Sequence, residues 1–138
     1  SLAEKSELAL FLFSFDAPHT GQYEPGGALA SALAGIFGPD ALIARMSGFH
    51  FAAALPGTNL FSARRQAEIL RVRLSAGTLP LPASARAAIG IVEREAGDSL
   101  SDMLMRGQWA HREACEAGGD CVRLAARAAF VPSRNAAG

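Results

Sequence analysis

A few side chains in this 138-residue chain have the chemistry and the spacing that a functional site needs. Asp16 ends a Phe-rich apolar run, and a carboxylate there can ligate a hard cation such as Mg²⁺ or serve as a turn residue that bonds its own backbone. The stretch Ser47-Gly48-Phe49-His50-Phe51 lies between two apolar runs, which indicates a β-hairpin with a tight turn at Ser47-Gly48. Its only titratable side chain is His50, and imidazole is a poor ligand for Mg²⁺.

A second group of donor atoms lies near the C-terminus. His111 and Cys115 are four residues apart in a segment expected to be helical, so they share a helix face, and Cys121 follows closely. These residues begin a zinc site, but a clear fourth ligand and the usual paired spacing are missing. We therefore expect no metal and no cofactor. Two cysteines do not make a disulfide scaffold, so we expect free thiols and a cytoplasmic location.

Composition excludes several classes of function. Lys plus Arg and Asp plus Glu are 13 each, so the formal net charge is zero and nothing predicts binding to nucleic acid or to an anionic membrane. The longest uninterrupted apolar run, Leu8 to Phe13, is too short to span a bilayer. With 50% hydrophobic and 19% charged residues, the chain has the composition of one globular domain.

The apolar periodicity predicts the order β-α-β-β-α-β-α-β. Leu8 to Phe15 is apolar throughout, as in a central strand that is buried on both faces. Asn59 is expected to cap a helix, and residues 17–25 are expected to form a loop. The other expected elements are helices at 26–37, 60–74 and 98 or 99 to 117, and strands at 41–46, 49–55, 85–92 and 121–124.

This order predicts an α+β fold: a mixed, largely antiparallel five-stranded sheet flanked by helices. We expect the folded domain to cover residues 8–126. Residues 1–7 are expected to be a linker from a larger protein, and residues 127–138 a C-terminal tail or linker.

The chain resembles GGDEF domains, the bacterial domains that make cyclic di-GMP from two molecules of GTP. Residues 44–51, followed by Leu55-Pro56-Gly57-Thr58, resemble the signature hairpin of that family. Leu10 to Asp16 is similar to its first strand, which ends in a metal-binding Asp, and Ala87 to Ile91 is similar to its Ser-Ile-Gly strand. The resemblance implies the nucleotide-cyclase palm fold.

The resemblance also shows what this sequence lacks. Phe49 and His50 stand where the family carries two acidic residues, and Cys115 replaces a Lys that steadies phosphate. The loop after Asp16 lacks the Asn that reads guanine, and the inhibitory Arg-x-x-Asp motif would fall on residues 38–41, which contain no Arg. Phosphoryl transfer needs cations that neutralise the triphosphate, so we expect no cyclase activity.

We expect a catalytically inactive GGDEF-like domain that regulates a larger cyclic di-GMP signalling protein through protein–protein interaction. Its partners would be other domains of the same chain, a separate signalling protein or a second copy in a homodimer. The alternative is a receptor domain that binds GTP or cyclic di-GMP without turnover. Either way, a remnant nucleotide site with no catalytic residue would comprise Asp16, Ser47, Gly48, Phe49 and His50.

Three further features have more than one interpretation each. Phe49 lies at the turn and is either core or part of an exposed adhesive patch. Trp109 is expected in the core, with ligand stacking and an interface anchor as the alternatives. Arg64, Arg65, Arg71 and Arg73 are expected to form a solvated helix face, with phosphate binding as the alternative.

Overall fold

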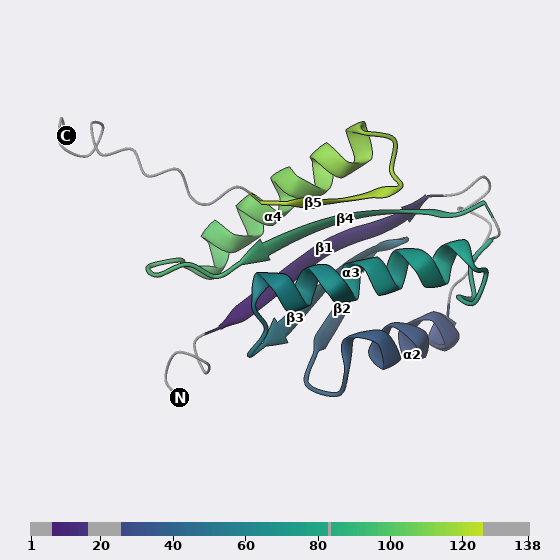
Figure 1. Ribbon diagram of the computed structural model, residues 1–138, viewed down its shortest axis with the longest axis horizontal. Helices are drawn as coiled ribbons and strands as arrows, with labels where there is room; N and C mark the ends of the chain where they lie inside the picture. The colour runs from purple at the N-terminus through teal and green to yellow at the C-terminus, as the bar shows by residue number, and fades with distance from the viewer. Residues whose placement is uncertain (1–6, 17–25, 83, 126–138) are drawn as a thin grey trace.

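The computed structural model describes residues 7–16, 26–82 and 84–125 (Figure 1). The predicted order of elements is confirmed, with boundaries that differ from the expected ones by at most two residues. The elements are β1 (Leu8–Asp16), α2 (Gly26–Phe37), β2 (Leu42–Ser47), β3 (His50–Pro56), α3 (Leu60–Ser75), β4 (Arg86–Glu93), α4 (Leu100–Glu116) and β5 (Cys121–Leu124). The expected loop at 17–25, the tail at 127–138 and the linker up to residue 6 lie outside the described residues.

The five strands form one mixed sheet in the order β2-β3-β1-β4-β5. β1 lies at its centre and runs antiparallel to both β3 and β4, whereas β4 and β5 are parallel. Helices α2 and α3 cover one face of the sheet and α4 covers the other (Figure 1). This arrangement is the predicted α+β fold with a largely antiparallel sheet.

Alternation along β1 divides the core into two parts. Phe11 and Phe13 belong to the large apolar cluster beneath α2 and α3. Leu10 and Leu12 belong to a smaller cluster on the α4 face, where they pack with Met103. Every residue from Ala9 to Phe15 is buried, which confirms that β1 is a central strand with both faces covered.

Side-chain caps fix where the two long helices begin. The Asn59 side chain accepts a hydrogen bond from the Ser62 amide at 2.9 Å, which confirms the predicted cap of α3. Ser99 caps α4 in a reciprocal arrangement, because its hydroxyl accepts from the Asp102 amide and the Asp102 carboxylate accepts from the Ser99 amide. Each cap satisfies amides that would otherwise lack an intrahelical partner.

Helix α4 lies unusually close to the sheet where two glycines meet it. A Cβ added at Gly90 of β4 would lie 2.4 Å from the backbone nitrogen of His111 and 2.8 Å from the carbonyl oxygen of Gly107. A Cβ added at Gly107 would lie 2.6 Å from a methyl carbon of Leu12. The backbones of α4 and β4 can approach this closely only because both positions lack a side chain.

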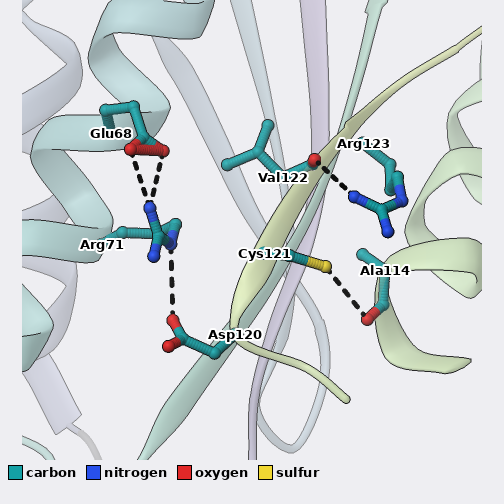
Figure 2. A network of polar contacts seen from close by, with 7 residues as sticks. All are labelled: Glu68, Arg71, Ala114, Asp120, Cys121, Val122 and Arg123. Atoms are coloured by element: carbon teal, nitrogen blue, oxygen red, sulfur yellow. Dashed lines mark hydrogen bonds and ion pairs between the residues drawn. The ribbon is translucent and has the colours of Figure 1, made fainter. Parts of the chain in front are cut away.

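An ion-pair network joins α3 to the loop that precedes β5 (Figure 2). The Arg71 guanidinium donates to the Glu68 carboxylate at 2.7 Å and to Asp120 at 3.3 Å. Both carboxylates are about half exposed, at 51% and 56%, so the network contributes little to stability. It orients the loop that leads into the last strand.

We predict that Gly90→Ala lowers the free energy of unfolding by about 1–3 kcal/mol, because the new methyl group meets backbone atoms of α4 that have no rotamer to change. Urea unfolding followed by circular dichroism measures the change. The matched control is Gly35→Ala, in the exposed interior of α2, where an added Cβ meets nothing within 4 Å. That variant should be more stable by up to about 1 kcal/mol. Equal effects of the two substitutions would contradict the proposed close contact.

Candidate functional site

The hairpin between β2 and β3 turns one residue later than its sequence predicts. Ser47 pairs with His50 across the two strands, so the two-residue turn consists of Gly48 and Phe49 rather than Ser47 and Gly48. Gly48 has a φ of 52°, which glycine adopts without strain. The Arg45 side chain donates to the Gly48 carbonyl at 2.7 Å and braces the turn.

Phe49 lies in the turn, yet its side chain is buried, with 8% exposed. It joins the same apolar cluster as Phe15 and Phe51, so the predicted common face of Phe49 and Phe51 is confirmed and the exposed adhesive patch is wrong. The Phe49 carbonyl accepts a hydrogen bond from the Phe15 amide at 3.1 Å. This contact fixes the tip of the hairpin against the end of β1.

The five residues predicted as a remnant nucleotide site lie at one end of the sheet. Asp16 ends β1, and Gly48 and His50 lie beside that end because β3 runs antiparallel to β1. Asp16, Ser47, Gly48 and His50 are exposed, whereas Phe49 points into the core. Asp16 is the only one of the five that carries a carboxylate, so this set offers one hard oxygen ligand from an acidic side chain.

On the α4 face of the sheet, the structure brings together a polar cluster that spacing in the sequence did not predict. Ser14 is buried, at 7% exposed, and its hydroxyl lies 2.7 Å from Nε2 of His111. The rings of His111 and His50 lie 5.6 Å apart, edge to face. Cys115 Sγ lies 3.6 Å from Nε2 of His111. The signals in the sequence were the shared helix face of His111 and Cys115 and Ser14 itself, a lone hydroxyl in an apolar strand.

The environment of His111 favours its neutral form. Burial lowers the pKa of this histidine, and the neighbouring His50 lowers it further. A neutral imidazole can accept the Ser14 hydroxyl proton at Nε2, which satisfies a hydroxyl that is otherwise buried among apolar side chains. A cavity of about 170 Å³ adjoins the pair and is lined by His50, His111, Gln108 and Ser47 together with apolar side chains.

Two other expectations can be compared with the structure. Trp109 is 60% exposed on the outer face of α4, with the Arg112 guanidinium 5.4 Å from its ring centroid, so the expected core position is wrong. The α4 face that meets the sheet holds smaller residues at this level, Gly107 and Ala110, which leaves no room there for an indole. On α3, Arg73 donates to the Thr78 hydroxyl at 3.1 Å, so Arg71 and Arg73 both hold intramolecular partners.

No protein-family model and no curated protein matches this chain. Solved structures do match it. The GGDEF domain of DgcB from Caulobacter crescentus in complex with cyclic di-GMP is 20% identical, with a TM-score of 0.73 over 86% of this chain and 78% of that one. The active GGEEF domain of a diguanylate cyclase from Vibrio cholerae is 17% identical, with a TM-score of 0.74 over 88% and 85%.

A third similar structure is the diguanylate cyclase SiaD from Pseudomonas aeruginosa in complex with its activator SiaC, at 23% identity and a TM-score of 0.69 over 87% of this chain and 50% of that one. These likenesses show that the fold is that of the GGDEF domains of diguanylate cyclases, as the hairpin resemblance implied. Among the described helices, none is both long enough and apolar enough to cross a membrane.

We predict that the domain loses stability as the pH falls from about 7.5 through the ordinary histidine pKa of about 6.5 and below. The folded state holds the pKa of His111 below its unfolded value, so the unfolded chain binds more protons there, and stability falls as the pH drops through that interval. Urea unfolding at several pH values measures the slope. His111→Gln, which keeps a polar partner for Ser14, should show a smaller slope. An unchanged slope in that variant would assign the pH dependence to other groups.

Proposed function

We propose that this chain is a catalytically inactive GGDEF-like domain that regulates a larger cyclic di-GMP signalling protein through protein–protein contacts. The fold supports the class of domain. The hairpin supports the loss of activity, because Phe49 carries a phenyl ring where metal-dependent phosphoryl transfer needs a carboxylate.

The single observation that carries this proposal is the position of Phe49. Its ring packs in the large apolar cluster, where Phe13, Phe15 and Phe51 lie within 6 Å of one another, with ring centroids 5.5 to 5.9 Å apart. A cation at this place would face aromatic carbon instead of oxygen. It would lose water ligands and gain no protein oxygen in their place. Asp16 is the acidic residue that remains in the predicted remnant nucleotide site, and one carboxylate alone binds Mg²⁺ weakly.

The outer face of α4 supports the part of the proposal that concerns interaction. Met105 and Trp109 lie one turn apart on this helix and are each 60% exposed. Methionine and tryptophan are enriched where proteins bind one another, and a large exposed indole is a common anchor of such contacts. Partner domains of the same chain, a separate signalling protein or a second copy are the candidates for this surface.

We predict that the purified chain makes no cyclic di-GMP when it is incubated with GTP and either Mg²⁺ or Mn²⁺. The reason is the lost carboxylate at Phe49 together with His50 at the adjacent position. Product is measured by chromatography, with an active GGEEF domain as the positive control. Steady formation of cyclic di-GMP above the background without enzyme would refute inactivity.

A nucleotide receptor is the second candidate function, and one cavity favours it. A cavity of about 400 Å³ lies between α2 and the hairpin, with Leu29, Ala34, Ile43 and Phe51 in its wall and Arg45 as its one cationic residue. This volume lies in the range of small-molecule sites. Its wall is apolar, however, with few groups that could read a base by hydrogen bonds.

We predict no binding of GTP or cyclic di-GMP up to millimolar concentration by isothermal titration calorimetry, because the wall of this cavity offers one cation and little else to a polar ligand. Micromolar binding that Arg45→Met weakens would favour the receptor over the interaction domain. Arg64→Met, on the exposed side of α3, is the matched control for the loss of one positive charge.

A further inference from the structure

Helix α3 carries large apolar side chains on its outer side. Phe61, Ile69 and Val72 are 71%, 45% and 63% exposed. An α-helix turns by about 100° per residue, so Ile69 and Val72 lie within about 80° of Phe61 around the helix axis. The three side chains therefore form one apolar strip that faces away from the sheet.

The charge on this side of α3 is positive. The helix contains four arginines and one glutamate, and that glutamate, Glu68, binds Arg71 at 2.7 Å. Arg64 and Arg65 are exposed and lie between Phe61 and Ile69 along the helix. We call the following residues the α3 surface: Phe61, Arg64, Arg65, Ile69 and Val72.

The outer side of α4 combines apolar side chains with the opposite charge. Met105 and Trp109 are each 60% exposed. Glu113 and Glu116 follow them toward the end of the helix and are exposed as well. Arg112, which lies over the Trp109 ring, offsets part of this negative charge. We call the following residues the α4 surface: Met105, Trp109, Glu113 and Glu116.

Within one copy of the chain, the two surfaces cannot meet. Helix α3 covers one face of the sheet and α4 covers the other (Figure 1). Two apolar surfaces of opposite charge on opposite faces of one domain are complementary only between copies. A contact between them would join two molecules of this chain.

An antiparallel alignment of the two helices brings their apolar side chains together. Ile69 and Val72 are about one turn apart on α3, and Met105 and Trp109 are about one turn apart on α4. Where Ile69 lies beside Trp109, opposite chain directions place Val72 beside Met105. Both pairs bury apolar surface that is exposed in the single copy, and such burial favours association.

The same alignment pairs opposite charges. Arg65 precedes Ile69 by about one turn, and Glu113 follows Trp109 by about one turn, so opposite chain directions bring Arg65 beside Glu113. A parallel alignment that kept both apolar contacts would carry Glu113 past Ser75, where α3 ends. Charge complementarity therefore selects the antiparallel orientation.

We propose that the α4 surface of one copy binds the α3 surface of a second copy. The inference rests on the proposed function, because it names a partner for the interaction surface on α4. The two surfaces differ, so the contact is heterologous, and each pair of copies keeps one free surface of each kind. Copies therefore join head to tail into assemblies larger than a dimer.

Sedimentation velocity of the purified chain tests the association. We expect monomers at low micromolar concentration and species larger than a dimer as the concentration approaches millimolar. Monomers at every concentration, or a dimer that never grows, would overturn the proposal. A dimer that never grows would indicate a contact between two identical surfaces.

Two variants that each remove one surface test the contact more sharply. Val72→Asp alters the α3 surface and Trp109→Ala alters the α4 surface, and each alone should raise the dissociation constant by at least about tenfold. Their equimolar mixture should form a 1:1 dimer and nothing larger, because one contact between unaltered surfaces remains. A mixture that stays monomeric would overturn the proposal. Circular dichroism confirms that both variants are folded.

The matched control is Leu42→Asp, which places a charge on an exposed apolar side chain of β2, outside both surfaces. It should associate as the unaltered chain does. Loss of association in this variant would assign the contact to the edge strand and overturn the proposal.

The charged pair has its own test. Arg65→Glu and Glu113→Arg should each weaken association when present alone. Their equimolar mixture should recover it, because every contact then joins either two unaltered or two exchanged charges. Absence of recovery would overturn the antiparallel alignment.

Failure of this inference and failure of the proposed function give different results. A chain that stays monomeric and makes no cyclic di-GMP would overturn the second copy as partner and leave the inactive interaction domain in place. A chain that forms cyclic di-GMP would refute the proposed function, whatever its state of association.

Discussion

The contact between α4 and the centre of the sheet sets the geometry of everything on that face. Gly90 and Gly107 remove two side chains from the interface, so the backbone of α4 lies directly against β4. This closeness brings His111 within hydrogen-bond distance of Ser14 on the neighbouring strand. With bulkier residues at the two glycine positions, the helix would lie farther out and the Ser14 hydroxyl would be buried without a protein partner, which costs about 1–3 kcal/mol.

The opposite face of the sheet is organised by aromatic packing that continues into the hairpin. Phe13 and Phe51 stack at 5.5 Å, and Phe15 meets both of them edge on. Phe49 extends this cluster to the turn, where its carbonyl also receives the Phe15 amide. The tip of the hairpin is therefore anchored by apolar burial and by a backbone hydrogen bond.

Much of this fold could be predicted because its local signals agree with its tertiary structure. The continuous apolar run of β1 identified the central strand, and Asn59 marked the start of α3. The turn was misplaced because its position depends on the pairing of Ser47 with His50, which is a property of two strands together. Trp109 was misplaced because periodicity alone does not show that the sheet-facing side of α4 has room only for small residues at that level.

The candidate site was less predictable for a physical reason. Asp16 and the hairpin residues were identified by their resemblance to motifs of the GGDEF family, and the antiparallel pairing of β1 with β3 brings them to one end of the sheet. The cluster of Ser14, His50, His111 and Cys115 combines two strands and a helix, with Ser14 and His111 97 residues apart, and it depends on how closely that helix approaches. No spacing rule encodes such an approach, because it is set by the absence of side chains at two distant glycines.

The two sides of the hairpin therefore carry different chemistry. The side chain of Phe49 turns into the apolar core. The next residue, His50, turns to the face where His111 and Cys115 lie. His50 and Phe51 point to opposite faces because side chains alternate along β3, and Phe49 in the turn lies on the same side as Phe51. The apolar side of the hairpin and the polar cluster of His50, His111 and Cys115 therefore lie on different faces of the sheet. A substitution at Phe49 can alter the apolar side of the hairpin without altering the polar cluster on the other face.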